Sequence, residues 1–301
     1  MSGPYVLLSG ACGTELERRG ARTPIPLWSA QALLDAPELV REVHRDHVRA
    51  GAAVVTANTF RTDRRTLAKA GLAMRARDLV RSAVALAREG VALAAPSHEV
   101  VVAGSIAPLE DCFRPDLVPT DAELRVEHGM RAGDLVAARA DLALVETMNT
   151  IREAVAALGA CRAACLPAAV SFTCQPGAKL LSGESLENAV AAVRAFQPLA
   201  ILVNCCATAT ATEAVEHLVR LAGSIPVGAY ANGMGVPDDE RGWRFEAGHG
   251  ADRETYLAAA SRWLDLGARW VGGCCGTTPA YVDDLRRLFD RRGIGTGRPG
   301  V

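Results

Sequence analysis

Three cysteines stand where short apolar runs of the chain end. Cys274 and Cys275 follow the run ARWVGG, and Cys205 follows the run AILVN. Zinc favours thiolate ligands, and three protein ligands leave its fourth tetrahedral position to a substrate. Free cysteine is also a common small core hydrophobe, so the spacing alone leaves both roles open. A disulfide between adjacent residues, whose Cα atoms lie ~3.8 Å apart, is disfavoured.

Short β-rich runs alternate with helical patterns along the whole chain. Strands are predicted at residues 5–8, 53–60 with an exit loop, 100–104, 141–146, 168–173, 200–204, 226–230 and 268–273. Helices are predicted at residues 15–19, 38–50, 73–89, 121–140, 151–165, 186–196, 212–222, 253–266 and 279–291. Eight strands in a chain near the typical ~250 residues predict an α/β fold, a single (β/α)₈ TIM-type barrel.

An open doubly wound sheet is the main alternative fold. Closure is favoured because no strong linker divides the chain and because polar residues recur where strands end, namely at Asn58, Ser105, Glu146, Asn204, Asn232 and Cys274. In closed barrels this C-terminal rim carries the chemistry. We place the barrel at residues 1–292 and a flexible, glycine-rich C-terminal tail at residues 293–301.

Composition narrows the class of protein. The 301 residues are 50% hydrophobic with a formal net charge of −1, so binding to nucleic acid or to an acidic membrane surface is not expected. Lysine occurs only at positions 69 and 179, which excludes the GK[ST] of a P-loop. Without a basic leader or an apolar membrane span, a cytoplasmic location is expected. There, nine cysteines are expected to be ligands, catalytic groups or core residues.

Four motifs resemble the homocysteine S-methyltransferase family. They are VNC at 203–205, GGCCGTTP at 272–279, GSIAP at 104–108 and VET at 145–147. The resemblance covers nearly the whole chain and implies a (β/α)₈ barrel with a catalytic zinc ion on Cys205, Cys274 and Cys275. Cys206 has no position in that ligand set. Zinc would deprotonate an acceptor thiol, which is otherwise mostly protonated at neutral pH.

The resemblance also implies how substrates bind. Glu146 resembles the family glutamate that holds the amino group of homocysteine, with a solvated rim carboxylate as the alternative. The predicted substrate-binding set is completed by Ser9, Gly10, Asn58, Asn204 and Asn232. The stretch SGACGTELE departs from the family pattern, because Ser9 stands where an aspartate is expected. The missing carboxylate removes one charge-assisted contact, of the kind worth ~1.5 to 3 kcal/mol.

These features predict methyl transfer from a sulfonium donor, S-methylmethionine or S-adenosylmethionine, to homocysteine, giving methionine. The donor expectation rests on a chain that matches only the barrel, without folate, cobalamin or betaine-type modules. One alternative is the same chemistry on another small thiol or selenol, motivated by Ser9. A second is a non-catalytic zinc-binding barrel with four protein ligands. The sequence leaves the oligomeric state open.

Two other features receive structural interpretations. His44 and His47 lie three residues apart on a helix without acidic or cysteine partners at ligand spacing, so a solvated helix face is expected. Cys12 lies in the loop after the first strand, near the predicted rim, where a packing role is expected.

Overall fold

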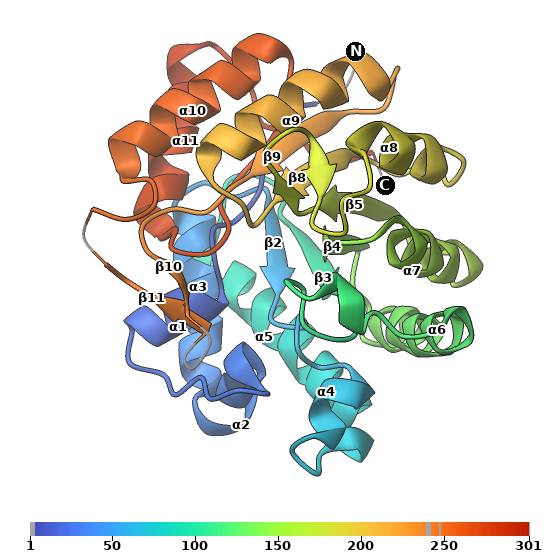
Figure 1. Ribbon diagram of the computed structural model, residues 1–301. Helices are drawn as coiled ribbons and strands as arrows, with labels where there is room; N and C mark the ends of the chain where they lie inside the picture. The colour runs from blue at the N-terminus through green and yellow to red at the C-terminus, as the bar shows by residue number, and fades with distance from the viewer. Residues whose placement is uncertain (1–3, 239–241, 247, 301) are drawn as a thin grey trace.

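Eight parallel strands form the centre of the molecule, surrounded by helices (Figure 1). The structure is a computed structural model that describes residues 4–238, 242–246 and 248–300. The strand order is β1-β12-β9-β8-β5-β4-β3-β2. The bounds are β1 (Val6–Leu7), β2 (Val54–Ala57), β3 (Val101–Ile106), β4 (Leu142–Met148), β5 (Ala168–Phe172), β8 (Ile201–Asn204), β9 (Val227–Tyr230) and β12 (Trp270–Val271).

The sheet closes on itself between β1 and β2. Leu8 forms a parallel bridge with Val54, and the backbone N–H groups of Ser9 and Ala53 donate across the seam at 2.8 Å each. The predicted (β/α)₈ barrel is therefore confirmed, and the open sheet is excluded. Every predicted strand is present, with β3 and β4 running two residues further than expected.

Helices cover the outside of the barrel. Their bounds are α1 (Gly13–Arg18), α2 (Ala32–Asp35), α3 (Pro37–Arg49), α4 (Arg64–Ala68), α5 (Ala76–Ala94), α6 (Asp121–Ala137), α7 (Ile151–Ala163), α8 (Leu186–Arg194), α9 (Thr208–Leu221), α10 (Arg253–Leu266) and α11 (Pro279–Arg291). Three 3₁₀ turns span Trp28–Gln31, Ala73–Arg75 and Pro115–Leu117. Local sequence explains several starts: Thr120 and Glu123 form a reciprocal capping box that begins α6.

Strand side chains alternate between two buried layers, as the two-residue period of a strand requires. The inner layer includes Val54, Val101, Leu142, Leu144 and Leu202. The layer that packs against the helices includes Val55, Val102, Ala143, Val145 and Val203. In β2, β4 and β8 the inner face continues for one more inward-facing residue after the last apolar one. These residues are Thr56, Glu146 and Asn204. The barrel interior thus changes from apolar to polar at its C-terminal rim.

Two antiparallel hairpins interrupt the βα alternation and were not predicted. One pairs β6 (Cys174–Gln175) with β7 (Lys179–Leu180), and the other pairs β10 (Val236–Asp238) with β11 (Gly242–Arg244). Both follow strands of the barrel at its C-terminal end, where loops carry function.

The chain after α11 runs beside the first strand. Thr296 forms a parallel bridge with Tyr5, and Arg298 pairs with Glu99 at 2.8 Å. Mobility of residues 293–301, and the domain boundary at 292, stay predictions. No helix in the described ranges is long and apolar enough to cross a membrane.

Gly228 of β9 allows the close approach of β12. A Cβ atom built on Gly228 would lie 1.8 Å from the carbonyl oxygen of Trp270. We therefore expect Gly228→Ala to lower the free energy of unfolding by about 3 kcal/mol or more, measured by urea denaturation. Gly133→Ala is the matched control, because its Cβ would meet nothing within 4 Å on α6. An unchanged midpoint for Gly228→Ala would contradict this packing.

Candidate functional site

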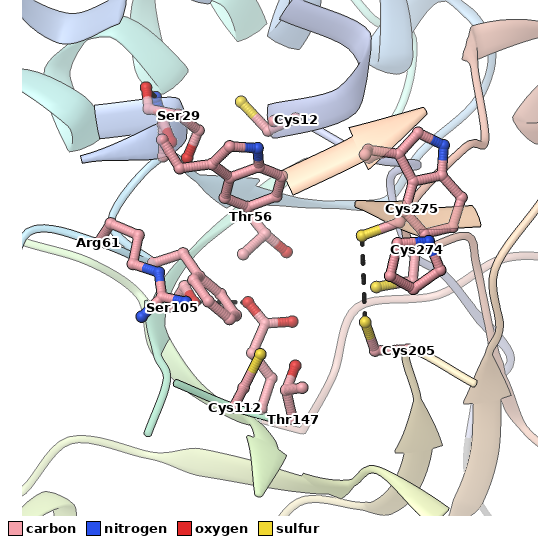
Figure 2. Close-up of a pocket in the computed structure, with 18 of the residues that line it drawn as sticks. Cys12, Ser29, Thr56, Arg61, Ser105, Cys112, Thr147, Cys205, Cys274 and Cys275 are labelled. Atoms are coloured by element: carbon pink, nitrogen blue, oxygen red, sulfur yellow. Dashed lines mark hydrogen bonds between the residues drawn. The ribbon is translucent and has the colours of Figure 1, made fainter. Parts of the chain in front are cut away.

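A cavity of about 830 Å³ opens at the C-terminal rim of the barrel. Figure 2 shows Cys205, Cys274 and Cys275 on one side of this cavity and Arg61 and Ser105 on the other. The lining comes from loops after most of the strands, including the β10–β11 hairpin. The cavity therefore lies where a barrel of this type carries its chemistry.

The three predicted cysteines converge at this cavity. Their sulfur atoms all lie within 4.8 Å of one another, and the Sγ atoms of Cys205 and Cys275 are 4.0 Å apart (Figure 2). Tetrahedral zinc with bonds of about 2.3 Å would place its sulfur ligands about 3.8 Å apart. The donor set and its spacing therefore fit a metal ion. Cys206 points elsewhere and packs in the main hydrophobic core.

Strained backbone places these side chains. Cys205 and Thr147 adopt left-handed conformations, with φ of 55° and 59°, directly after β8 and within β4. Such values are rare for residues other than glycine and persist only where the surroundings enforce them. Gly276 also has a positive φ, 74°, and a Cβ there would lie 2.2 Å from the carbonyl oxygen of Met234. The glycine that follows the cysteine pair therefore permits the tight turn.

Backbone contacts hold the cysteine turn against neighbouring loops. The N–H of Cys274 donates to the carbonyl of Ala231, and that of Gly233 donates to the carbonyl of Cys275. Thr277 accepts from the N–H of Ala11 at 3.1 Å and donates to the carbonyl of Cys274 at 2.6 Å. The loop after the first strand is thus tied to the loop after the last.

The three cysteines affect one another's pKa values in opposite directions. Hydrogen bonds from the thiols of Cys205 and Cys275 hold the pKa of Cys274 well below its usual value. The same contacts with Cys274 raise the pKa of Cys205 well above its usual value. Asn204 also contributes to the lowered pKa of Cys274, since its Nδ2 lies 3.8 Å from that sulfur. If more than one of these buried thiols is ionised, a cation is needed to stabilise their negative charges.

Glu146 lies on the inner face of β4, 8% exposed, and lines the cavity. Ser105 donates to its Oε1 at 2.5 Å and Tyr230 donates to its Oε2 at 3.2 Å. Burial, followed by the nearby charge of Cys274, raises the pKa of Glu146 to about 7. The two hydroxyl donors and the buried cation Arg131 favour the ionised form, so this carboxyl can bind a cation above that pH.

Other predicted site residues divide into two groups. Ser9, Gly10 and Asn58 line the cavity. Asn204 is fully buried and bonds to Thr147 and Ser171, so it reaches the site only through its neighbours. Asn232 is not among the described residues that line the cavity. Its backbone N–H donates to the carbonyl oxygen of Cys206.

The structure corrects the interpretation of two histidines on α3. His44 and His47 are each 1% exposed and belong to the buried stripe of the helix, not to a solvated face. His47 supports the first loop: its Nδ1 accepts from the N–H of Gly10 at 3.4 Å, and its Nε2 lies 3.0 Å from the carbonyl of Ala11. Burial lowers the pKa of His47, which keeps the ring neutral.

The sequence patterns did not predict several of the residues that line the cavity. Tyr230 ends β9 on its inner face, a position that strand parity could have revealed. No periodicity marks four others: Trp28 begins a 3₁₀ turn, Arg61 and Cys112 lie in loops, and Trp243 belongs to the unpredicted β10–β11 hairpin. Trp28 and Phe60 meet edge to face, with ring centroids 6.1 Å apart, and form an aromatic wall of the cavity.

A rim cavity at which three cysteine sulfurs converge, with spacing that fits a metal ion, is typical of (β/α)₈-barrel enzymes. The family model described as homocysteine S-methyltransferase matches residues 6–289, and the chain belongs to this family. The chain is 33% identical to the homocysteine S-methyltransferase of Escherichia coli K12, over 93% of this chain and 94% of the relative. Membership confirms the resemblance read from the motifs and makes the protein a methyltransferase.

Two further comparisons agree with this family. A crystal structure of the metallated form of the homocysteine methyltransferase MmuM from E. coli matches with a TM-score of 0.82 and 31% identity, covering 95% of this chain and 97% of that one. The selenocysteine Se-methyltransferase of Brassica oleracea var. italica is 28% identical, over 97% of this chain and 91% of the relative. The family thus includes relatives that act on sulfur and on selenium.

The raised pKa of Glu146 has a consequence for stability. In the folded protein the carboxyl binds its proton up to about pH 7, whereas the unfolded chain releases it near the ordinary value of 4.5. Stability should therefore fall as pH rises from 4.5 to 7, and Glu146→Gln should remove this loss, worth at most about 3 kcal/mol. Urea denaturation of metal-free wild type and variant across this range measures it, and parallel pH profiles would contradict it.

Proposed function

We propose that the protein is a zinc-dependent S-methyltransferase that moves a methyl group from a sulfonium donor to the thiol of homocysteine, giving methionine. The observation that carries this proposal is the convergence of three cysteine sulfurs, all within 4.8 Å of one another, on one rim cavity. Family membership supports the reaction class. The metallated E. coli structure supports the presence of a metal.

Cys205, Cys274 and Cys275 would hold the zinc ion. Bound zinc would supply a Lewis acid that lowers the pKa of the acceptor thiol, so that its sulfur is nucleophilic at neutral pH. Asn204 steadies the ligand set through its contact with the sulfur of Cys274. The metal group found among the described residues contains three members, which favours catalysis over a structural ion with four protein ligands.

Glu146 would bind the ammonium group of homocysteine. Ser105 and Tyr230 each occupy one carboxylate oxygen and fix the orientation of the group. Because the side chain lies on the cavity wall in a buried environment, its attraction for an ammonium ion is stronger than it would be in water. The acceptor would thus be held at its amino end by Glu146, with its sulfur toward the cysteines.

The other residues that line the cavity are suited to a sulfonium donor. The aromatic wall of Trp28 and Phe60 and the indole of Trp243 face the same cavity, and aromatic faces attract cations. The departing thioether leaves as a neutral molecule when the methyl group moves to the acceptor sulfur. The transfer therefore needs no general acid. S-methylmethionine and S-adenosylmethionine both belong to this donor class.

Removing one thiol tests the metal site. We expect Cys205→Ser to lose bound zinc and to lower methyl transfer to homocysteine by at least about 100-fold, because a hydroxyl is a poor replacement for a thiolate ligand. Metal content by elemental analysis and methionine formation are the two measurements. Cys206→Ala is the matched neighbour and should keep both. Retained zinc together with retained activity in Cys205→Ser would refute the site.

A second candidate is the same transfer to another small thiol or selenol. Ser9 favours it, because this neutral side chain lines the cavity and its Oγ accepts from the N–H of Thr56 at 3.3 Å, so it offers no charge to a substrate amine. The similarity to a selenocysteine Se-methyltransferase supports a selenol within the range of acceptors.

Restoring a carboxylate at position 9 separates the two candidates. If homocysteine binding is limited by the missing charge, Ser9→Asp should improve kcat/KM for homocysteine by about 10-fold, as one added charge-assisted contact implies. Ser9→Asn is the uncharged control of similar size. No gain with aspartate would mean that this position does not limit the choice of acceptor.

A further inference from the structure

Three cationic side chains line the cavity, and two of them are already paired. Lys69 contacts Glu110 at 2.5 Å, and Arg114 pairs with Asp116. Arg61 has no carboxylate within ion-pair distance among the residues that the structure describes. It therefore offers the cavity a charge without a counter-ion.

The position of Arg61 is fixed although its charge is unmatched. Its Nη1 donates to the backbone carbonyl of Glu110 at 3.1 Å, and its guanidinium lies 5.4 Å from the ring centre of Phe60. Its buried Nε has no hydrogen-bond partner in the described structure. A partly buried guanidinium with unused donors is suited to a planar anion, which it can bind through two parallel hydrogen bonds.

The cavity thus has three chemically different sides. The cysteine group is suited to a sulfur atom and Glu146 is suited to a cation. Arg61 lies with Ser105 across the cavity from the cysteines (Figure 2). Sulfur, ammonium and carboxylate are the three polar ends of a sulfur-containing amino acid. The neutral side chain of Ser9 adds no negative charge to the part of the cavity that would bind a cation.

We propose that Arg61 binds the α-carboxylate of an amino acid substrate and determines specificity for it. This inference rests on the proposed function, which has two substrates of this chemistry, the thiol acceptor and the methionine-derived donor. Because Ser9 is neutral, Glu146 alone binds the amino group of the substrate. Arg61 binds the carboxylate group.

Binding of two probes that need no metal and no turnover tests the inference. L-methionine carries the carboxylate, and 3-(methylthio)propylamine is the same molecule without it. Calorimetric titration above the pKa of Glu146 should show that wild type prefers methionine by about 10- to 100-fold, the range expected for one charge-assisted pair. Arg61→Met should bind both probes equally, and Arg61→Lys should show an intermediate preference, because lysine keeps the charge and loses the planar fork.

Arg114→Met is the matched control, because it removes the same charge from the cavity where Asp116 already pairs it. It should keep the wild-type preference. An Arg61→Met variant that still prefers methionine as wild type does would overturn the inference, as would a wild type that does not distinguish the probes or does not bind methionine. Circular dichroism and thermal unfolding of each variant confirm that the comparison is between folded proteins.

Steady-state kinetics identify the source of the carboxylate. A higher KM for homocysteine alone in Arg61→Met assigns the carboxylate to the acceptor, and a higher KM for S-methylmethionine alone assigns it to the donor. Unchanged KM values for both substrates contradict the inference. Absence of methyl transfer in wild type would instead refute the proposed function, and the titrations would still decide the role of Arg61.

Discussion

The alternation of side chains along a barrel strand is the constraint on which the site depends. Every second residue faces the barrel interior, so an inner layer of aliphatic side chains continues directly into the residues that face the cavity. In β4 this sequence is Leu142, Leu144 and Glu146, and in β8 it ends at Asn204. The apolar layer closes off one side of the polar layer, which leaves the rim cavity on the other side. Glu146 consequently has a raised pKa although two hydroxyl groups contact it.

The loops above this layer add the groups that strands cannot supply. Left-handed backbone at Cys205 turns the thiol toward the cysteine pair after β12, and the glycine at 276 permits the turn that presents that pair. Buried His47 supports the loop after β1 from outside, through contacts with Gly10 and Ala11. The functional groups are therefore held by backbone contacts of their loops as much as by the strands.

Sequence patterns predicted the fold and the cysteine group because both have strong local signals. Alternating apolar runs identify strands. The pair Cys274–Cys275 at a strand end is a specific motif of the family that the chain resembles, and without that resemblance its spacing left a packing role open. His44 and His47 were assigned to solvent, although their spacing from Val40, Val43 and Val48 matches a buried helical stripe. Arg61 lies in a loop and Trp28 begins a short 3₁₀ turn. Their place at the cavity depends on contacts between distant segments that no local pattern records.

The contacts between the first and last loops imply an order of assembly. Ala11 bonds to Thr277 and Thr14 bonds to Gly276, which brings together residues more than 260 positions apart in the chain. A growing polypeptide on the ribosome can form the first seven strands while the thiol pair is still unsynthesised or inside the exit tunnel. The three sulfur atoms can therefore converge only after β12 and the loop that follows it have been synthesised, so this group forms together with the closure of the barrel.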